Sequence, residues 1–465
     1  MYFCQIAVPG MELVHNGGTG IHKQTMAVKI GKDEKWKRFV VVGNGIAGIS
    51  AAYAIRGLNK EAQIKIISEE PYPTYSPCVL PNYLSGEISR DRVFVREFPD
   101  YSKDNIQLIT SEKVITLDVE RKSVVMQAEN IVYDKLIIAT GSKPIIPPIK
   151  GINRKGVFTF KSIEDADGIC TWEGLTAVVI GSGPIGIEAS MALKRRGYKV
   201  FLIELLDRIL PQVFDDYPAS LIREVLKENG IDVATQERVV EILGGESVEG
   251  VLSDRREIKC DTVILATGMR PGKGFVEGIL ELGKLGGIKV NHRMGTNIQD
   301  VYACGDCAEA LSLIDGQPIL SLLWHNARQQ GEVAGSNAAG IPRTYTGSLN
   351  ITGVEVSGLK AISIGSIGAG LESDLEIIEV KRNEGYRRLI LSKEVLVGIQ
   401  SINWDEDLGL FLAAILRKEK VKTYKDLMSF RRPPFRFLKQ FPFGRKLHSV
   451  RGQRLKLARD QLIFK

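Results

Sequence analysis

The sequence predicts an α/β fold with two similar strand–turn–helix units, followed by a smaller α+β domain. Apolar residues at 39–42 run into a glycine-rich turn and then an alanine-rich stretch. The same pattern returns at 177–193, where the second turn begins 138 residues after the first. A short apolar run before such a turn is typical of a buried parallel strand. From about residue 341, segments rich in glycine, serine and isoleucine favour antiparallel strands instead.

Length and composition limit the class of protein. At about 150 residues per domain, the 465 residues suggest three domains. The 44% hydrophobic and 25% charged residues are ordinary for a globular protein. The apolar runs fall short of the roughly 20 residues of a membrane-spanning helix. We expect a soluble cytoplasmic protein, with residues 1–37 as an N-terminal extension in which Met26 is a second candidate start.

The cysteines and histidines do not indicate a disulfide framework or a metal site. Six cysteines are scattered along the chain without the regular spacing of a disulfide-rich domain. With five histidines and no paired CxxC elements, we expect no metal site. A cysteine with a special role should therefore serve redox chemistry.

The two glycine-rich turns carry the GxGxxG spacing of dinucleotide-binding loops. The glycines are Gly43, Gly45 and Gly48 in the first turn and Gly181, Gly183 and Gly186 in the second. A pyrophosphate must meet backbone N–H groups at a helix N-terminus, and only glycine lets the chain turn sharply and approach that closely. Because each turn has a strand before it and a helix after it, both predict Rossmann-like dinucleotide-binding domains.

An acidic residue follows the second strand of each unit. Glu69 lies 21 residues after Gly48, and Glu204 lies 18 residues after Gly186. Both separations fit the roughly 20 residues expected for a carboxylate that binds an adenosine ribose, with Glu70 as an alternative to Glu69. The carboxylate of Glu204 would repel a 2′-phosphate about 4 Å away by about 1–4 kcal/mol. NADH is therefore favoured over NADPH.

These features resemble the FAD- and NAD(P)H-dependent pyridine nucleotide-disulfide oxidoreductases over roughly residues 38–400. Three further motifs follow in the family's order: Ala139-Thr140-Gly141, Ala266-Thr267-Gly268 and Val301–Asp306. The first two match the family's short ATG turns. In the third, the resemblance implies that Gly305 and Asp306 bind FAD, the aspartate through the ribityl chain.

The resemblance also implies a domain organisation. An FAD-binding domain would be formed by residues 38–150 and 273–340, with an NAD(P)-binding domain at 151–272 inserted between its parts. Residues 341–427 would form a C-terminal interface domain of a homodimer. Residues 428–465 would remain as a basic aromatic tail.

Cys78 decides which chemistry the resemblance implies. Dithiol members of the family carry two cysteines five residues apart, whereas here Tyr83 stands in place of the second. The segment is similar to the single-cysteine branch, which includes coenzyme A disulfide reductases and NADH oxidases. There one thiolate cycles through a mixed disulfide or a sulfenic acid. Ile46 replaces a histidine of the oxygen- and peroxide-reducing members, which favours a disulfide or persulfide acceptor over oxygen.

A second hypothesis makes Cys78 a passive thiol. Rubredoxin reductases and the flavoprotein subunits of nitrite reductases have a similar segment with another residue at this position. They pass single electrons to a protein partner. The chain would then reduce a small rubredoxin- or ferredoxin-like protein, or serve as a subunit of a larger redox complex.

Other residues have two open interpretations. Glu188 matches an acid near the nicotinamide in relatives, although it could equally cap a helix. His325 is a candidate proton donor near the flavin, with packing or capping as the simpler alternative. Cys304 and Cys307 form a CxxC pair, but a tight turn around Gly305-Asp306 explains their small side chains without a dithiol role.

The C-terminal tail carries most of the positive charge. Residues 417–465 hold 16 lysines and arginines against three acids, whereas the whole chain has a net charge of only +7. Within it, 428–446 interleave aromatic and cationic residues, which suits an anionic membrane surface or an acidic redox partner. A solvated extension packed on the dimer is the alternative. No other feature indicates nucleic-acid binding, so we expect none.

Overall fold

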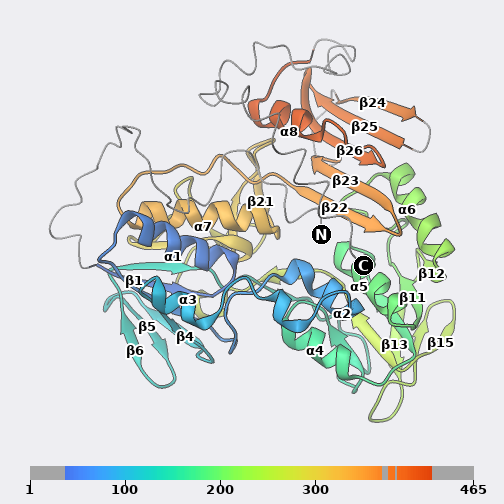
Figure 1. The fold of residues 1–465 in the computed structure, drawn as a ribbon, viewed down its shortest axis with the longest axis horizontal. Coiled ribbons are helices and arrows are strands. Elements are labelled where there is room, and N and C mark those ends of the chain that lie inside the picture. The colour runs from blue at the N-terminus through green and yellow to red at the C-terminus, as the bar shows by residue number, and fades with distance from the viewer. Residues whose placement is uncertain (1–36, 369–374, 383–384, 422–465) are drawn as a thin grey trace, which may run out of the picture.

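The computed structural model describes residues 37–368, 375–382 and 385–421, and Figure 1 shows their arrangement. Residues 1–36 of the predicted extension and the whole basic aromatic tail lie outside the described residues. Within the described ranges, none of the helices combines the length and the apolar character that crossing a bilayer requires.

Five parallel strands form the sheet of the first unit. In spatial order they are β19 (Val301–Ala303), β7 (Lys135–Ile138), β1 (Arg38–Val42), β2 (Gln63–Ile67) and β3 (Ile106–Ile109). The helices α1 (Ile46–Leu58) and α7 (Trp324–Ala338) pack side by side against this unit (Figure 1). Since β19 and α7 come from beyond residue 300, two separate stretches of chain build the first unit.

The second unit repeats this plan between those two stretches. Its parallel sheet has the order β12 (Ile231–Ala234), β11 (Lys199–Ile203), β10 (Thr176–Ile180), β16 (Thr262–Leu265) and β9 (Val157–Thr159). Its helices are α4 (Ile163–Thr171), α5 (Pro184–Arg195) and α6 (Asp216–Glu228). Four of the five residues of β10 are buried, as in β1, which explains why both strands appear in the sequence as continuous apolar runs.

The similarity of the two units extends to a small antiparallel sheet in each. These sheets are β4 (Val114–Asp118), β5 (Ser123–Met126) and β6 (Asn130–Val132) in the first unit, and β13 (Val239–Leu243), β14 (Gly250–Ser253) and β15 (Glu257–Lys259) in the second. In both, the strands have five, four and three residues and precede the strand that pairs with β1 or β10. Neither sheet is predictable from the sequence, because such short strands carry little periodicity.

The remaining elements are short. They are α2 (Leu80–Ser85), α3 (Phe98–Lys103), the strands β8 (Ser142–Pro144) and β17 (Met269–Pro271), and a three-stranded sheet of β18 (Ile288–Lys289), β20 (Ala308–Leu311) and β21 (Pro318–Leu320). Strands β8 and β17 pair antiparallel where the chain passes into and out of the second unit. The two chain segments that link the first unit to the second therefore form a two-stranded ribbon.

The C-terminal region forms a five-stranded antiparallel sheet with one helix. The order is β22 (Ile351–Val356), β23 (Leu359–Gly365), β26 (Val395–Ile402), β25 (Gly385–Ser392) and β24 (Leu375–Arg382), and α8 (Leu408–Arg417) packs against β26. The predicted class is thus confirmed: two Rossmann-like α/β units and a C-terminal α+β domain.

Helices α1 and α7 approach so closely that their contact requires glycine. A Cβ at Gly335 would lie 2.3 Å from the carbonyl oxygen of Ala51, and one at Gly331 would lie 2.1 Å from that of Ala47. Both distances are far below ordinary contact, and the obstructing atoms are backbone. These glycines therefore set the separation of the two helices.

We expect Gly335→Ala to destabilise the protein by about 1–3 kcal/mol, because the added methyl group forces the helices apart. The matched control is Gly57→Ala in α1, where a Cβ would have nothing within 4 Å. That exposed helical position should gain about 0.5–1 kcal/mol from alanine. Chemical denaturation of both variants measures the difference, and equal stabilities would contradict the close packing.

Candidate active site

In the first glycine turn, two glycines are required by packing and one faces open space. Gly43 has a φ of +112°, and a Cβ there would lie 2.1 Å from the carbonyl oxygen of Ala139. A Cβ at Gly48 would lie 2.0 Å from the carbonyl oxygen of Gly43, whereas nothing lies within 4 Å of a Cβ at Gly45. Gly45 is the N-cap of α1, without a side-chain cap or an acid in the first turn. The helix N-terminus is thus open to a phosphate group.

The second turn has the same geometry. Gly181 has a φ of +100°, and a Cβ there would lie 2.4 Å from the carbonyl oxygen of Ala266. A Cβ at Gly186 would lie 1.9 Å from the carbonyl oxygen of Gly181, and Gly183, the N-cap of α5, again faces open space. Both turns therefore fit the pyrophosphate of a dinucleotide.

The two ATG motifs lie directly against these turns, since Ala139 and Ala266 contact the first glycine of each. The glycines that end the motifs, Gly141 and Gly268, have φ values of +67° and +106°. The hydroxyl of Thr140 donates to the carbonyl oxygen of Gly272. The structure thus brings these predicted residues to the same edge of the sheets as the glycine turns.

Glu204 is held beside the second turn by three donors. Its carboxylate accepts from Ser182 N (2.8 Å), Ser182 Oγ (2.6 Å) and Leu206 N (2.9 Å), and the residue is 7% exposed. Two carboxylate oxygens offer about four acceptor positions, so one remains for a ribose hydroxyl. Arg208 pairs with Asp207 and Asp216, and its guanidinium also donates to the carbonyl oxygen of Phe214.

The corresponding acid of the first unit is shifted along the chain. Glu204 directly follows β11, and the residue that directly follows β2 is Ser68. Glu69 is exposed and lies 3.7 Å from Lys113. Glu70 accepts a hydrogen bond from the Tyr75 hydroxyl (3.1 Å), and burial raises the pKa of its carboxyl group. Both candidate acids thus lie one or two residues further from the end of β2 than Glu204 lies from the end of β11.

Asp306 joins three separate segments of the chain. It follows Gly305, whose φ is +77°. Its carboxylate accepts from Ser142 Oγ (2.7 Å) and lies 3.7 Å from Lys161 Nζ. Sequence reasoning did not identify Ser142 or Lys161, because neither belongs to a motif and their proximity to Asp306 arises only in the fold.

Cys78 is an exposed cysteine, outside any disulfide, in the helical turn Pro77–Val79 that leads into α2. The second unit holds α2 in place. The hydroxyl of Tyr83 donates to Asp167 on α4 (2.8 Å), and Arg196 at the end of α5 donates to the carbonyl oxygen of Leu84 (3.1 Å). The segment with the candidate redox cysteine therefore belongs to the first unit in sequence but packs on helices of the second.

Three other predicted candidates have structural partners. Cys304 and Cys307 are fully buried, and burial raises the pKa of both thiols, which stay protonated. The ring nitrogen Nε2 of His325 lies 2.8 Å from the carbonyl oxygen of Leu349, and burial lowers the pKa of the ring. These contacts favour packing roles. Glu188 lies in the second turn of α5, half-buried.

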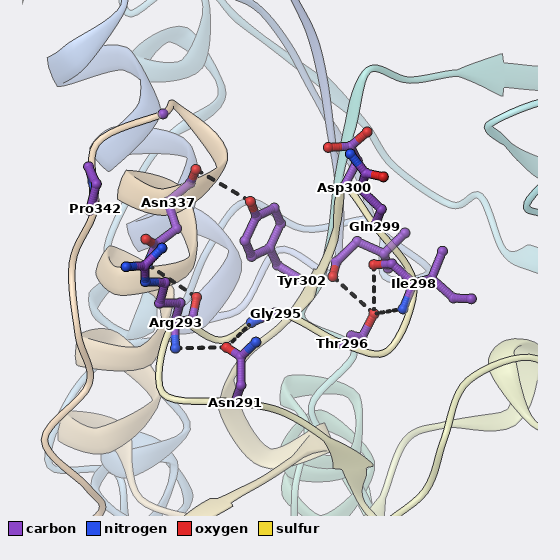
Figure 2. Close-up of a pocket in the computed structure, with 12 residues that line it drawn as sticks. Asn291, Arg293, Gly295, Thr296, Ile298, Gln299, Asp300, Tyr302, Asn337 and Pro342 are labelled. Atoms are coloured by element: carbon purple, nitrogen blue, oxygen red, sulfur yellow. Dashed lines mark hydrogen bonds between the residues drawn. The ribbon is translucent and has the colours of Figure 1, made fainter.

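A polar pocket of about 290 Å³ is lined by none of these residues, and Figure 2 shows the side chains that line it. It is lined by the loop before β19, by the first two residues of β19, and by Asn337, Gly340 and Pro342 at the end of α7 and beyond it. The pocket adjoins the amino end of β19, whereas Gly305 and Asp306 follow the carboxyl end. Ligands of parallel α/β sheets bind at the carboxyl ends of the strands. This pocket is therefore not part of the candidate cofactor site.

Comparison with known proteins agrees with this geometry. Residues 37–331 match the family model described as pyridine nucleotide-disulphide oxidoreductase. The chain belongs to this family. It is 35% identical to an NADH oxidase of Methanocaldococcus jannaschii over 71% of this chain and 76% of that protein.

Two solved structures are similar over most of the chain. A NAD-dependent persulfide reductase from A. fulgidus is 29% identical, with a TM-score of 0.79 over 85% of this chain and 79% of that one. An NADH:rubredoxin oxidoreductase from Clostridium acetobutylicum is 30% identical, with a TM-score of 0.69 over 85% and 99%. The protein is thus an FAD-dependent NAD(P)H oxidoreductase, as the sequence predicted.

Substitutions in the two glycine turns should affect different cofactors. We expect Gly43→Ala to yield protein without bound FAD, because the methyl group collides with the backbone of Ala139. Gly181→Ala should retain FAD and raise the KM for NADH several-fold. The ratio of flavin to protein absorbance and steady-state kinetics measure both effects. If Gly181→Ala lost FAD and Gly43→Ala raised only the KM for NADH, the assignment of the two turns to FAD and NADH would be reversed.

Proposed function

We propose that the enzyme uses NADH to reduce a disulfide or persulfide, with oxygen as a lesser acceptor, through bound FAD and Cys78. The observation that carries the proposal is Cys78 itself, an exposed thiol at the position of the family's redox cysteine. A NAD-dependent persulfide reductase among the similar structures supports it. The match to an NADH oxidase supports oxygen as the further acceptor.

In this proposal the first turn and Asp306 hold FAD, and the second turn and Glu204 hold NADH. The helix N-termini at Gly45 and Gly183 supply N–H groups to the two pyrophosphates. When bound, FAD would supply two-electron chemistry, taking a hydride from NADH. Glu69 or Glu70 would hold the ribose of FAD, and Glu188 would lie beside the nicotinamide of NADH.

Cys78 would act on the sulfur acceptor as a thiolate. Its sulfur attacks one sulfur of the disulfide RS–SR′, forms a mixed disulfide and releases the other as a thiolate. Two electrons that originate from NADH and one proton then break the mixed disulfide, returning the Cys78 thiolate and releasing the second thiol. Because Tyr83 replaces the second cysteine of dithiol members, no internal disulfide can form there.

The domain assignment is part of the same proposal. We assign FAD to residues 38–150 and 273–340, NAD(P)H to 151–272, and a homodimer interface to 341–427. A cytoplasmic location is part of the proposal, and the five described cysteines, none of which forms a disulfide, are consistent with it.

We expect Cys78→Ser to lower turnover with coenzyme A disulfide and polysulfide at least about 100-fold, since the nucleophile is lost. Reduction of ferricyanide by NADH should stay near the wild-type rate, because it needs only the flavin. Cys170→Ser is the matched control, at a half-buried cysteine on α4. Full turnover of Cys78→Ser with both sulfur acceptors would refute the thiol mechanism.

Glu204→Gln tests the preference for NADH. The amide keeps an oxygen that can accept from Ser182 or Leu206 but removes the charge that repels a 2′-phosphate. The ratio of kcat/KM for NADH to that for NADPH should fall about tenfold or more. An unchanged ratio would show that Glu204 does not face the ribose.

The alternative is electron transfer to a small redox protein or within a larger complex. The similarity to an NADH:rubredoxin oxidoreductase favours it. In that case Cys78→Ser would retain full NADH-driven reduction of rubredoxin or ferredoxin. Removal of the basic tail 428–465 would weaken the binding of the protein partner at low salt. If the tail binds a membrane instead, its removal would weaken binding to anionic liposomes.

A further inference from the structure

The C-terminal sheet presents a polar row to the second unit. Glu379, Arg388 and Gln400 are directly opposite one another in β24, β25 and β26, so their side chains lie on one face of the sheet. The same face carries Tyr386 and Ile402, which belong to a core shared with the second unit. The other face packs against α8. In Figure 1, α6 of the second unit lies beside β22 and β23 of this sheet.

Asp215, directly before α6, meets this polar row. Its backbone N–H donates to Gln400 Oε1 (3.2 Å), and its carboxylate forms an ion pair with Arg388. Gln400 is fully buried, and the Arg388 side chain is 11% exposed. Asp215 is the N-cap of α6 but makes no side-chain cap hydrogen bond. An aspartate at this position ordinarily caps its own helix, so its carboxylate serves the contact between the domains instead.

Asp215 also ends the loop that starts at Glu204, the residue assigned to the NADH ribose. Leu205 and Leu206, at the start of this loop, are 57% and 49% exposed. Two adjacent exposed leucines beside the carboxylate form an apolar surface that an adenosine would cover. The loop 205–214 therefore has one end at the candidate ligand and the other at the C-terminal sheet.

The middle of the loop is held against the second glycine turn. Leu210 is fully buried with a φ of +49°, a left-handed conformation that is unfavourable for leucine and persists only where its surroundings hold it. Its N–H donates to the carbonyl oxygen of Ser182 (3.1 Å). Phe214, next to Asp215, is buried in the shared core. A change at the sheet is thus transmitted to the glycine turn by a packed loop.

We propose that the C-terminal sheet is part of the NADH site: Arg388 and Gln400 hold Asp215, and the loop that ends there presents Glu204 to the adenosine ribose. This inference rests on the proposed assignment of the second turn to NADH. Arg388 and Gln400 are positioning residues, since they act through Asp215. They affect only the adenosine half of the dinucleotide.

The test compares ligands that contain or lack that half, in the full-length FAD-loaded enzyme. Arg388→Met and Gln400→Leu should each raise the KM for NADH and the inhibition constant of ADP-ribose about five- to tenfold. Turnover of reduced nicotinamide mononucleotide, which has no adenosine, should be unchanged. Gln400→Leu is the milder variant, because its Nε2 is buried without a hydrogen-bond partner among the described residues. Arg388→Lys should restore part of the NADH affinity.

Lys360→Met is the matched control on the other face of the sheet. Lys360 alternates with the core residue Ala361 and pairs with Asp405 (3.4 Å), so its loss should leave the KM for NADH unchanged. The inference would be overturned if Arg388→Met and Gln400→Leu impaired turnover of NADH and of the mononucleotide equally. It would also be overturned if the KM for NADH were unchanged in both variants. Gly181→Ala separates the two claims. If it leaves the KM for NADH unchanged, the assignment of the second turn fails; if it alone raises that KM, only the role of the sheet fails.

Discussion

Direct backbone contact within each glycine turn is the constraint on which the rest of the structure depends. At Gly48 and Gly186 a Cβ would lie 2.0 Å and 1.9 Å from the carbonyl oxygen of the first glycine in the turn. Each helix therefore crosses its own turn at a distance that only glycine permits. This contact fixes where the helix begins relative to the strand and leaves its first N–H groups open to a phosphate. The positions of the ATG turns and of Glu204 follow from it.

The second unit connects the other parts of the chain. One end of α5 borders the candidate NADH site at Gly183, and Arg196 at the other end bonds the helix that follows Cys78. The loop before α6 meets the C-terminal sheet at Asp215. The candidate NADH site, the thiol and the C-terminal domain thus share elements of one unit, which gives a physical path by which dinucleotide binding and thiol chemistry can influence each other.

Local patterns made the framework predictable from the sequence. A strand, a glycine turn and a helix are contiguous in the chain, so both strand–turn–helix units could be inferred. The C-terminal strands and the helix that follows Cys78 were likewise visible as local patterns. Contacts between distant segments could not. Lys161 approaches Asp306, and Arg388 approaches Asp215, only after the chain has folded. Counting residues also did not show that Ser68, rather than an acid, directly follows β2, because spacing has a tolerance of one or two positions.

If electrons from NADH reach the acceptor through Cys78, the thiol must carry part of the acceptor during turnover. Mass spectrometry of the Cys78 peptide after anaerobic incubation with coenzyme A disulfide detects such an adduct. We expect a coenzyme A adduct on Cys78 that disappears when NADH is added, with release of coenzyme A. Continued turnover of the disulfide with no adduct on Cys78, or an adduct that NADH does not remove, would contradict this electron path.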